Sequence, residues 1–383
     1  MRLHIAGGRA LLPDGFADTD IAIEEGRIAA IRSGSGGRVL DARGLLVLPG
    51  IVDIHGDAFE RQVQPRPGIG FPMDIAVRDT DAQLLANGIT TAFHGVTLSW
   101  EPGLRSAEAW TALLDALDAA RPVLGCDTRI HLRFEAYNLD ALDLALDDIA
   151  RGRVHMLAFN DHTPAILRKI ADPVTGAKFS DRAGMSLAAF GALAGRIAAF
   201  APQVEAGRAR IAAAARAAGL PMASHDDETV AMRDGFRALG ATICEFPVAE
   251  DVAQAARAAG DWVAMGCPNV VRGKSHLGWA SAAAMAEAGI CRVLTSDYFY
   301  PAMLRAPFVL AARGAVDLAA AWQLVSGNPA TAAGLTDRGR IAEGARADLV
   351  LVDATDSPRV VATIANGRLA HARADLVADH AMA

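Results

Sequence analysis

Apolar and polar residues alternate near both ends of the chain. Residues 2–5 and 20–24 alternate in this way, and a Glu25-Gly26 turn leads to a further alternating run. Residues 347–353 and 360–365 repeat the pattern before an Asn366-Gly367 turn. Period-two alternation bounded by such turns predicts short β-strands joined by hairpins.

These two groups of strands are each too small to close a sandwich alone. We therefore predict one small β-sandwich domain that both ends of the chain build together, from residues 1–50 and 338–375. Residues 376–383 are expected to form a tail.

The middle of the chain has a different pattern. Eight short segments, each nearly continuous in apolar residues, alternate with alanine-rich stretches that are typical of helices. They are residues 51–55, 89–94, 129–135, 154–159, 221–225, 241–246, 262–266 and 292–297. Buried strands alternating with helices indicate a parallel sheet, and eight of them predict an α/β fold, a (β/α)8 TIM barrel over residues 51–337. Several segments end in His, Asp or Glu at the carboxyl edge, where the active sites of such barrels form.

Composition narrows the class of protein. The 383 residues are 52% hydrophobic with a net charge of −7, and no long basic run occurs, so we expect no nucleic-acid partner. No apolar run reaches the ~18 residues of a membrane span, and the residues after Met1 lack the apolar stretch of a secretory signal. We therefore expect a cytoplasmic enzyme without a membrane partner. The four cysteines lie far apart with no C-x-x-C pair, which argues against a zinc ribbon and against a disulfide scaffold.

Arginine carries nearly all of the positive charge, because lysine occurs only at Lys169, Lys178 and Lys274. Genomic base composition explains this bias, and so does a need for guanidinium groups that bind phosphate through two parallel hydrogen bonds. Both explanations stay open.

The clearest chemical signal is the segment 48–57, Leu-Pro-Gly-Ile-Val-Asp-Ile-His-Gly-Asp. His55 and Asp57 are two residues apart, so they are expected to face the same way at the end of the first barrel strand. An imidazole and a carboxylate on one face make half of a site for a divalent metal ion.

These residues resemble the amidohydrolase superfamily. The P-G-x-V-D-x-H opening, the segment 328–335 that begins Asn-Pro-Ala-Thr, and the segment 339–350 that begins Gly-Arg-Ile-Ala-Glu-Gly are shared signatures that together cover the whole chain. The resemblance implies a metal-dependent hydrolase. Most relatives carry H-x-H on the first strand, whereas this chain has H-x-D.

That departure points to a subfamily. The segments 55–61, 94–95, 131–135, 161–164, 225–229 and 266–276 resemble the α-D-ribose 1-methylphosphonate 5-triphosphate diphosphatases of the carbon–phosphorus lyase pathway. This resemblance implies hydrolysis of a ribose 5-triphosphate to the 5-phosphate and diphosphate during phosphonate catabolism.

The resemblance also implies metal ligands. Many relatives join two metal ions through a carbamylated lysine, but none of the three lysines ends a central strand. Glu135 closes the third strand and is expected to supply a carboxylate in its place, although an ordinary salt bridge is the alternative. His225 is expected as a ligand, and Glu245 either as a ligand or as a partner of one.

Asp297 ends the eighth strand. In relatives an aspartate at this place touches the metal and takes the proton from the attacking water, which is the catalytic role expected here. The alternative is a cap on the following turn. The metal is expected to be one or two ions, zinc first, with manganese, iron or magnesium as alternatives.

A triphosphate substrate needs cations and donors at the mouth of the barrel. The expected substrate-binding residues lie in loops or at strand ends: Arg61, His94, Arg133, Asp161, His162, Asp226, Arg272, Lys274 and His276.

Two other functions stay open: hydrolysis of an amide, by a deacetylase or a cyclic amide hydrolase, and a non-catalytic scaffold that binds partners. The oligomeric state is also open, with a homodimer the commonest outcome.

Overall fold

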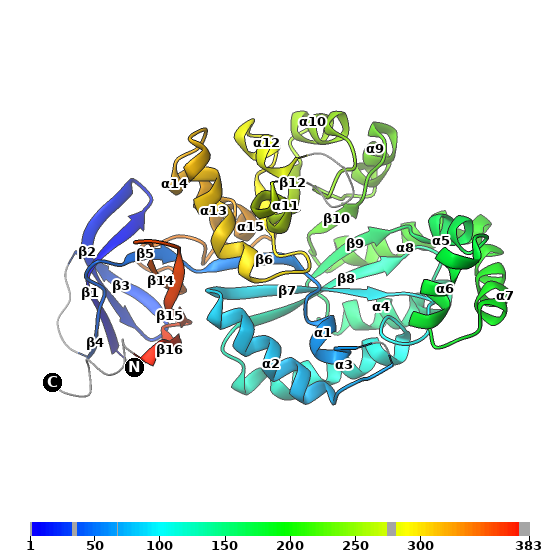
Figure 1. Ribbon diagram of the computed structural model, residues 1–383, viewed down its shortest axis with the longest axis horizontal. Helices are drawn as coiled ribbons and strands as arrows, with labels where there is room; N and C mark the ends of the chain where they lie inside the picture. Colours follow the sequence, from blue (N-terminus) through cyan, green and yellow to red (C-terminus); the bar gives the residue numbers. More distant parts are fainter. Residues whose placement is uncertain (1, 33–36, 67, 274–280, 375–383) are drawn as a thin grey trace.

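The computed structural model describes residues 2–32, 37–66, 68–273 and 281–374. Within these residues the strands form two eight-stranded sheets, one made from the two ends of the chain and one made from its middle. Figure 1 shows the first sheet in blue and red beside the second, whose strands run from blue to yellow.

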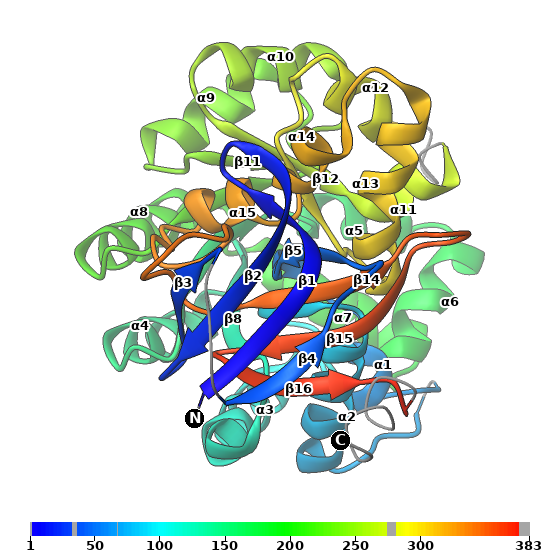
Figure 2. The same ribbon diagram turned by 90° about the vertical axis from the view of Figure 1, so that its left-hand side faces the viewer.

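The terminal sheet joins segments from opposite ends of the sequence. Its path runs β16-β15-β14-β5-β1-β2-β3, with β4 paired to β1. The β5–β14 pairing, for example Val47 opposite Leu351, brings the N-terminal and C-terminal strands together. Side chains of both ends share one core, which includes Ile5, Ile23 and Ile364; Figure 2 shows this sheet facing the viewer. Its strands are β1 (Arg2–Leu12), β2 (Gly15–Glu24), β3 (Arg27–Ile31), β4 (Arg38–Asp41), β5 (Leu46–Pro49), β14 (Leu349–Asp353), β15 (Arg359–Ala365) and β16 (Arg368–Ala372).

The second sheet is the predicted (β/α)8 barrel. Its strands pair in parallel and in sequence order from β6 to β13. A parallel bridge between Gly56 and Asp297 joins the last strand to the first. The strands are β6 (Ile51–Gly56), β7 (Ile89–Leu98), β8 (Asp127–Glu135), β9 (Met156–Asn160), β10 (Met222–His225), β11 (Ile243–Glu245), β12 (Trp262–Gly266) and β13 (Val293–Thr295).

Helices cover the outside of the barrel. The described helices are α1 (Glu60–Val63), α2 (Met73–Ala86), α3 (Ala107–Ala120), α4 (Leu142–Ala150), α5 (Thr163–Lys169), α6 (Pro173–Arg182), α7 (Leu187–Ala198), α8 (Val204–Ala217), α9 (Val230–Ala238), α10 (Glu250–Ala258), α11 (Cys267–Arg272), α12 (Ala282–Glu287), α13 (Pro301–Arg313), α14 (Leu318–Gln323) and α15 (Gly327–Ala332), with short 3-10 turns at Arg121–Val123, Leu139–Ala141 and Ala201–Gln203. Apolar side chains of these helices and the outward side chains of the strands form two large clusters. The inward side chains form a separate cluster that includes Ile54, Phe93 and Val293.

One helical stretch, Leu187–Ala217, is long and apolar enough to cross a membrane by length and composition. It comprises α7, a 3-10 turn and α8, and Arg208 on α8 pairs with Asp161 at the end of β9. Length and composition alone are weak evidence for a membrane segment.

The observed barrel strands match the predicted segments closely, and β7 differs most. It continues to Leu98 rather than ending at His94, so His94 lies in the middle of a strand.

Candidate metal centre

Alternation along β8 aims three polar side chains into the barrel. Ile130, Leu132 and Phe134 pack in the outer cluster. His131, Arg133 and Glu135 occupy the intervening positions and therefore face the interior, because side chains alternate along a strand. All three are buried.

A bulge brings His55 to the same interior. The pairing of β6 with β7 slips in register between Asp53 and Gly56. Ile54 belongs to the interior cluster, yet the neighbouring His55 also reaches inward, with its ring edge-on to His131 at 5.2 Å. An extra residue in a strand re-aims the side chains that follow it, so strict alternation fails at this position.

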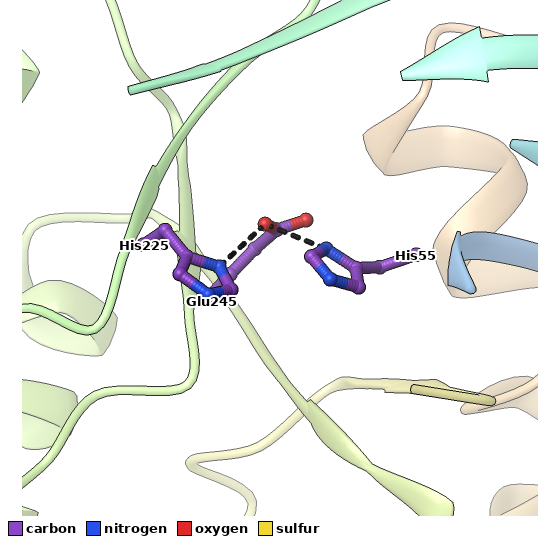
Figure 3. A group of neighbouring side chains, drawn as sticks. All are labelled: His55, His225 and Glu245. Carbon is purple, nitrogen blue, oxygen red and sulfur yellow. Dashed lines mark hydrogen bonds and ion pairs between the residues drawn. The ribbon is translucent and has the colours of Figure 1, made fainter. Parts of the chain in front are cut away.

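Glu245 lies between two histidines that are far apart in sequence. Its Oε2 lies 2.9 Å from Nδ1 of His55 and 3.4 Å from Nδ1 of His225. Figure 3 shows the carboxylate between the two rings, with dashed lines to each. His55 is the penultimate residue of β6, His225 and Glu245 end β10 and β11, and all three are buried.

Burial controls the protonation of this cluster. It lowers the pKa of His55 to about 3, with the nearby Arg133 charge acting in the same direction, and it lowers the pKa of His225 well below its usual value. It raises the pKa of Glu245 to about 7, partly offset by His131 and Arg133. The imidazoles are therefore neutral at physiological pH, which is the form that binds metal ions.

His131 is a site residue that the sequence analysis did not single out. Its Nδ1 lies 3.0 Å from the backbone oxygen of Ile54. Because a carbonyl oxygen only accepts, Nδ1 carries the proton and Nε2 keeps a free lone pair. That Nε2 is buried and has no hydrogen-bond partner among the described residues, and the same holds for Oε1 of Glu245. The H-x-R-x-E spacing of 131–135 is the signal that points to His131.

The donor set fits a divalent cation. Ligand atoms of His55, His225 and Glu245 lie within 4.8 Å of one another. Neutral imidazoles with a carboxylate suit zinc and other transition metals, and the unpartnered atoms of His131 and Glu245 are acceptors that a cation would satisfy. His55, His225 and Glu245 are therefore the residues that would hold it. His225 would bind it only after Arg133 releases Nε2, because a neutral imidazole that accepts at Nε2 carries its proton on Nδ1. Asp57 and Asp297, expected as ligands, lie outside this group of three.

Arg133 links the two sides of the barrel mouth. Its Nη2 donates to Nε2 of His225 at 2.8 Å, and its Nη1 lies 3.4 Å from Oδ2 of Asp57. Its Nε is buried without a partner among the described residues. This places a buried positive charge directly beside the histidine–glutamate cluster.

Glu135 has a different set of contacts from Glu245. Its Oε1 accepts hydrogen bonds from the backbone N–H groups of His162 and Thr163, at 3.0 and 3.1 Å, and from the Thr163 hydroxyl at 2.9 Å. Glu135 thus caps the start of α5. That contact differs from the arginine salt bridge that was the alternative to a ligand role, and a cation there would have to compete with these donors.

His162 lies between two carboxylates. Its Nδ1 is 3.3 Å from Oε2 of Glu135 and its Nε2 is 3.8 Å from Oδ2 of Asp226. Burial acts to lower the pKa of His162, but its interactions with Asp226 and Glu135 outweigh burial and raise the pKa to about 9. The ring is therefore cationic at neutral pH.

Asp297 follows β13 with a left-handed backbone, φ 55°. Its backbone N–H donates to the backbone oxygen of His55 at 3.0 Å, and its backbone oxygen accepts from the N–H of Asp57 at 2.9 Å. These two hydrogen bonds hold Asp297 where the last barrel strand meets the first. Burial, reinforced by the charge of Asp57, raises the pKa of Asp297 to about 7.

The remaining expected residues are spread more widely. Asp161 is ion-paired with Arg208. His94 lies away from the cluster on the outer side of β7, where its ring packs on Phe59 at 5.0 Å. Arg61 donates to the backbone oxygen of Tyr298, and Arg272 lies 3.4 Å from the Tyr298 hydroxyl. Lys274 and His276 lie outside the described residues.

Comparison with known proteins agrees with this architecture. Residues 283–371 match the model of the amidohydrolase family. Over 335 residues the chain is 34% identical to an α-D-ribose 1-methylphosphonate 5-triphosphate diphosphatase of Escherichia coli K12, covering 83% of this chain and 86% of that protein. The chain belongs to the amidohydrolase superfamily. The superfamily and this relative indicate a hydrolase, and members of the superfamily typically bind divalent metal ions.

Other relatives share parts of the sequence or the fold. An allantoinase of Bacillus licheniformis is 27% identical over 138 residues, which cover 36% of this amidohydrolase and 28% of the allantoinase. The crystal structure of a β-aspartyl dipeptidase from Fervidobacterium islandicum superposes with a TM-score of 0.65 at 15% identity, covering 97% of this chain and 96% of the dipeptidase. At that identity the likeness shows the fold alone.

Proposed function

We propose that this amidohydrolase hydrolyses α-D-ribose 1-methylphosphonate 5-triphosphate to the 5-phosphate and diphosphate. The observation that carries the proposal is the 34% identity, over 83% of the chain, with the Escherichia coli diphosphatase. The substrate is a small phosphorylated sugar phosphonate, and the reaction belongs to phosphonate catabolism.

The charges at the barrel mouth are consistent with such a substrate. Arg133 and the cationic His162 lie beside the cluster of His55, His225 and Glu245. Both groups donate hydrogen bonds, and neither needs to gain a proton to bind a phosphate oxygen at neutral pH. We propose that Arg133 and His162 bind the phosphate groups and that Asp226 binds the ribose hydroxyls.

A divalent cation held by His55, His225 and Glu245 would lower the pKa of a water bound to it. Its positive charge would also stabilise the negative charge on the phosphoryl oxygens. Asp297 accepts the proton of the attacking water, because its pKa of about 7 leaves a large carboxylate fraction at neutral pH. One oxygen–phosphorus bond forms from water, the bridging bond to the outer two phosphates breaks, and diphosphate leaves with the bonding electrons.

The partial similarity to an allantoinase favours a second candidate, hydrolysis of a cyclic amide. The positive charges of Arg133 and His162 beside the cluster favour the phosphate chemistry over it.

One experiment separates the two candidates. The purified protein is loaded with zinc or manganese and supplied with the ribose triphosphate, and the products are followed by phosphorus NMR; a panel of cyclic amides is tested in parallel. We expect diphosphate and the 5-phosphate in equal amounts, and no amide cleavage. Amide turnover without diphosphate release would overturn the proposal, and His55→Ala serves as the control for contaminating phosphatase.

A further inference from the structure

A buried polar network lies directly behind the His225–Glu245 pair. In the parallel pairing of β10 with β11, Ser224 is opposite Cys244 and His225 is opposite Glu245. His225 and Glu245 face the interior, so Ser224 and Cys244 face outward, one residue away. Both are fully buried.

Asp227 ties these two outward side chains together. Its Oδ2 accepts hydrogen bonds from the Ser224 hydroxyl and, at 3.4 Å, from the Cys244 thiol. Its backbone oxygen accepts from Val248 at 3.1 Å. One fully buried residue therefore contacts both strands that carry the histidine and the glutamate.

Arg233 on α9 completes the network. It is fully buried, and its Nη1 donates to Oγ of Ser224 at 2.6 Å while its Nε donates to Oδ2 of Asp261 at 2.9 Å. It also donates to the backbone oxygens of Ala241 and Ile243. A buried guanidinium is tolerated only when its donors are satisfied in this way.

The backbone is strained directly after the two residues that lie in front of this network. Asp226 and Phe246, the residues immediately after His225 and Glu245, have left-handed backbones with φ of 56° and 52°. Non-glycine residues adopt this conformation at a cost and keep it only when the surroundings hold them. Asp227 follows the first of these residues, and Val248, which donates to Asp227, comes shortly after the second.

We propose that Asp227 and Arg233 are positioning residues that set the separation of His225 and Glu245 and thereby the affinity of the site for a divalent cation. The inference rests on the cation centre of the proposed function. Groups behind metal ligands typically change metal affinity by about 10- to 100-fold when they are removed. Neither side chain belongs to the group of residues that would hold the cation.

The test measures Co²⁺ and Zn²⁺ dissociation constants, the visible absorption spectrum of the Co²⁺ protein and the thermal midpoint. Asp227→Ala and Arg233→Met are expected to weaken cation binding about 10- to 100-fold and to change the Co²⁺ spectrum. Asp227→Asn keeps an acceptor oxygen for Ser224 and is expected to restore most of the affinity. If one of the first two variants does not fold, the other carries the test.

Arg237→Met is the matched control. Arg237 lies on the same helix and donates to Oδ2 of Asp261 at 2.6 Å, and its described ion pairs are with Asp261 and Asp234 rather than with Asp227. It should lower the thermal midpoint without changing affinity or spectrum. Equal weakening in this control, or wild-type affinity and spectrum in Asp227→Ala and Arg233→Met, would overturn the positioning role alone. A wild-type protein that binds neither ion would overturn the cation centre itself.

Discussion

The imidazole rings of His55 and His225 are stacked, with centroids 5.2 Å apart and an angle of 8° between their planes. Both present Nδ1 to the same oxygen of Glu245. Phe246 meets both rings edge-on, at 4.9 and 5.3 Å. The two histidines come from β6 and β10, which are not neighbours in the barrel. Their shared contacts with Glu245 and Phe246 therefore keep the two rings parallel.

This arrangement predicts that Glu245 and Glu135 differ in their importance for metal binding. Glu245→Gln should lose most of the bound cation, because it removes the negative charge between the two histidines and replaces one carboxylate oxygen with an amide NH2 group. Glu135→Gln should keep the cation and lower the thermal midpoint by only about 1 °C, because it weakens the cap on α5 by about 1 kcal/mol in a chain of this length. Elemental analysis of both purified variants measures the difference.

The two variants are matched in size and chemistry, so each serves as the control for the other. Loss of the cation from Glu135→Gln with retention in Glu245→Gln would reverse the assignment and restore Glu135 as the ligand.

The barrel was predictable from the sequence because its strands are buried on both faces and read as short apolar runs. The prediction ended β7 at His94, whereas the strand continues to Leu98 and both Val96 and Leu98 pack in the outer cluster. His94 consequently lies outside the centre, on the face of β7 opposite Phe93.

The site residues were predictable from the sequence only where alternation along a single strand determines which way a side chain points. Alternation from Arg133 and Glu135 identifies His131, but the bulge that turns His55 inward leaves no mark in the sequence. The contacts of Glu135 with the start of α5 depend on how the loop after β9 folds back. The pairing of Asp161 with Arg208 depends on α8, and no local pattern connects residues so far apart.

Asp297→Asn tests the proton acceptor. Asparagine fits the space and tolerates the left-handed backbone at this position, so the fold should be unchanged. It cannot take a proton, and we expect kcat to fall by at least ~100-fold, the lower end of what a positioned general base supplies. Diphosphate release and the thermal midpoint are the two measurements; near-normal turnover would remove Asp297 from the mechanism.

Arg338 ties the segment before β14 to the base of the barrel. Its Nη1 donates to Oγ1 of Thr91 at 2.8 Å and to Oδ2 of Asp127 at 2.6 Å, and its side chain is 5% exposed. Arg338→Met should lower the free energy of unfolding by about 2–4 kcal/mol, because it leaves Asp127 partly uncompensated.

The control for this variant is Arg359→Met. Arg359 pairs with Asp353 but its side chain is 57% exposed, and such surface pairs contribute within about 1 kcal/mol. Chemical denaturation measures the free energy of unfolding of both variants. Equal losses would show that the buried contacts of Arg338 stabilise the protein no more than an exposed ion pair does.

His155 predicts a pH dependence of stability that arises away from the metal centre. Its Nδ1 accepts a hydrogen bond from the Ile130 N–H at 3.1 Å, so the folded state needs this nitrogen unprotonated. Burial, together with the charges of Arg129 and Arg121, lowers the pKa of His155 to about 4. The unfolded chain binds the proton near pH 6.5, so between these two values it binds more protons than the folded chain does. Stability therefore falls as the pH falls from about 6.5 to about 4.

His155→Asn isolates this contribution, because the amide oxygen keeps the acceptor and does not titrate. At pH 7 the variant should be slightly less stable than the wild type, since it loses the packing of the ring. Between pH 7 and pH 4.5 the wild type should lose about 1–3 kcal/mol more than the variant. Other buried histidines titrate equally in both proteins, so denaturant unfolding across this range reports His155 alone, and parallel stability curves would contradict the role of its neutral ring.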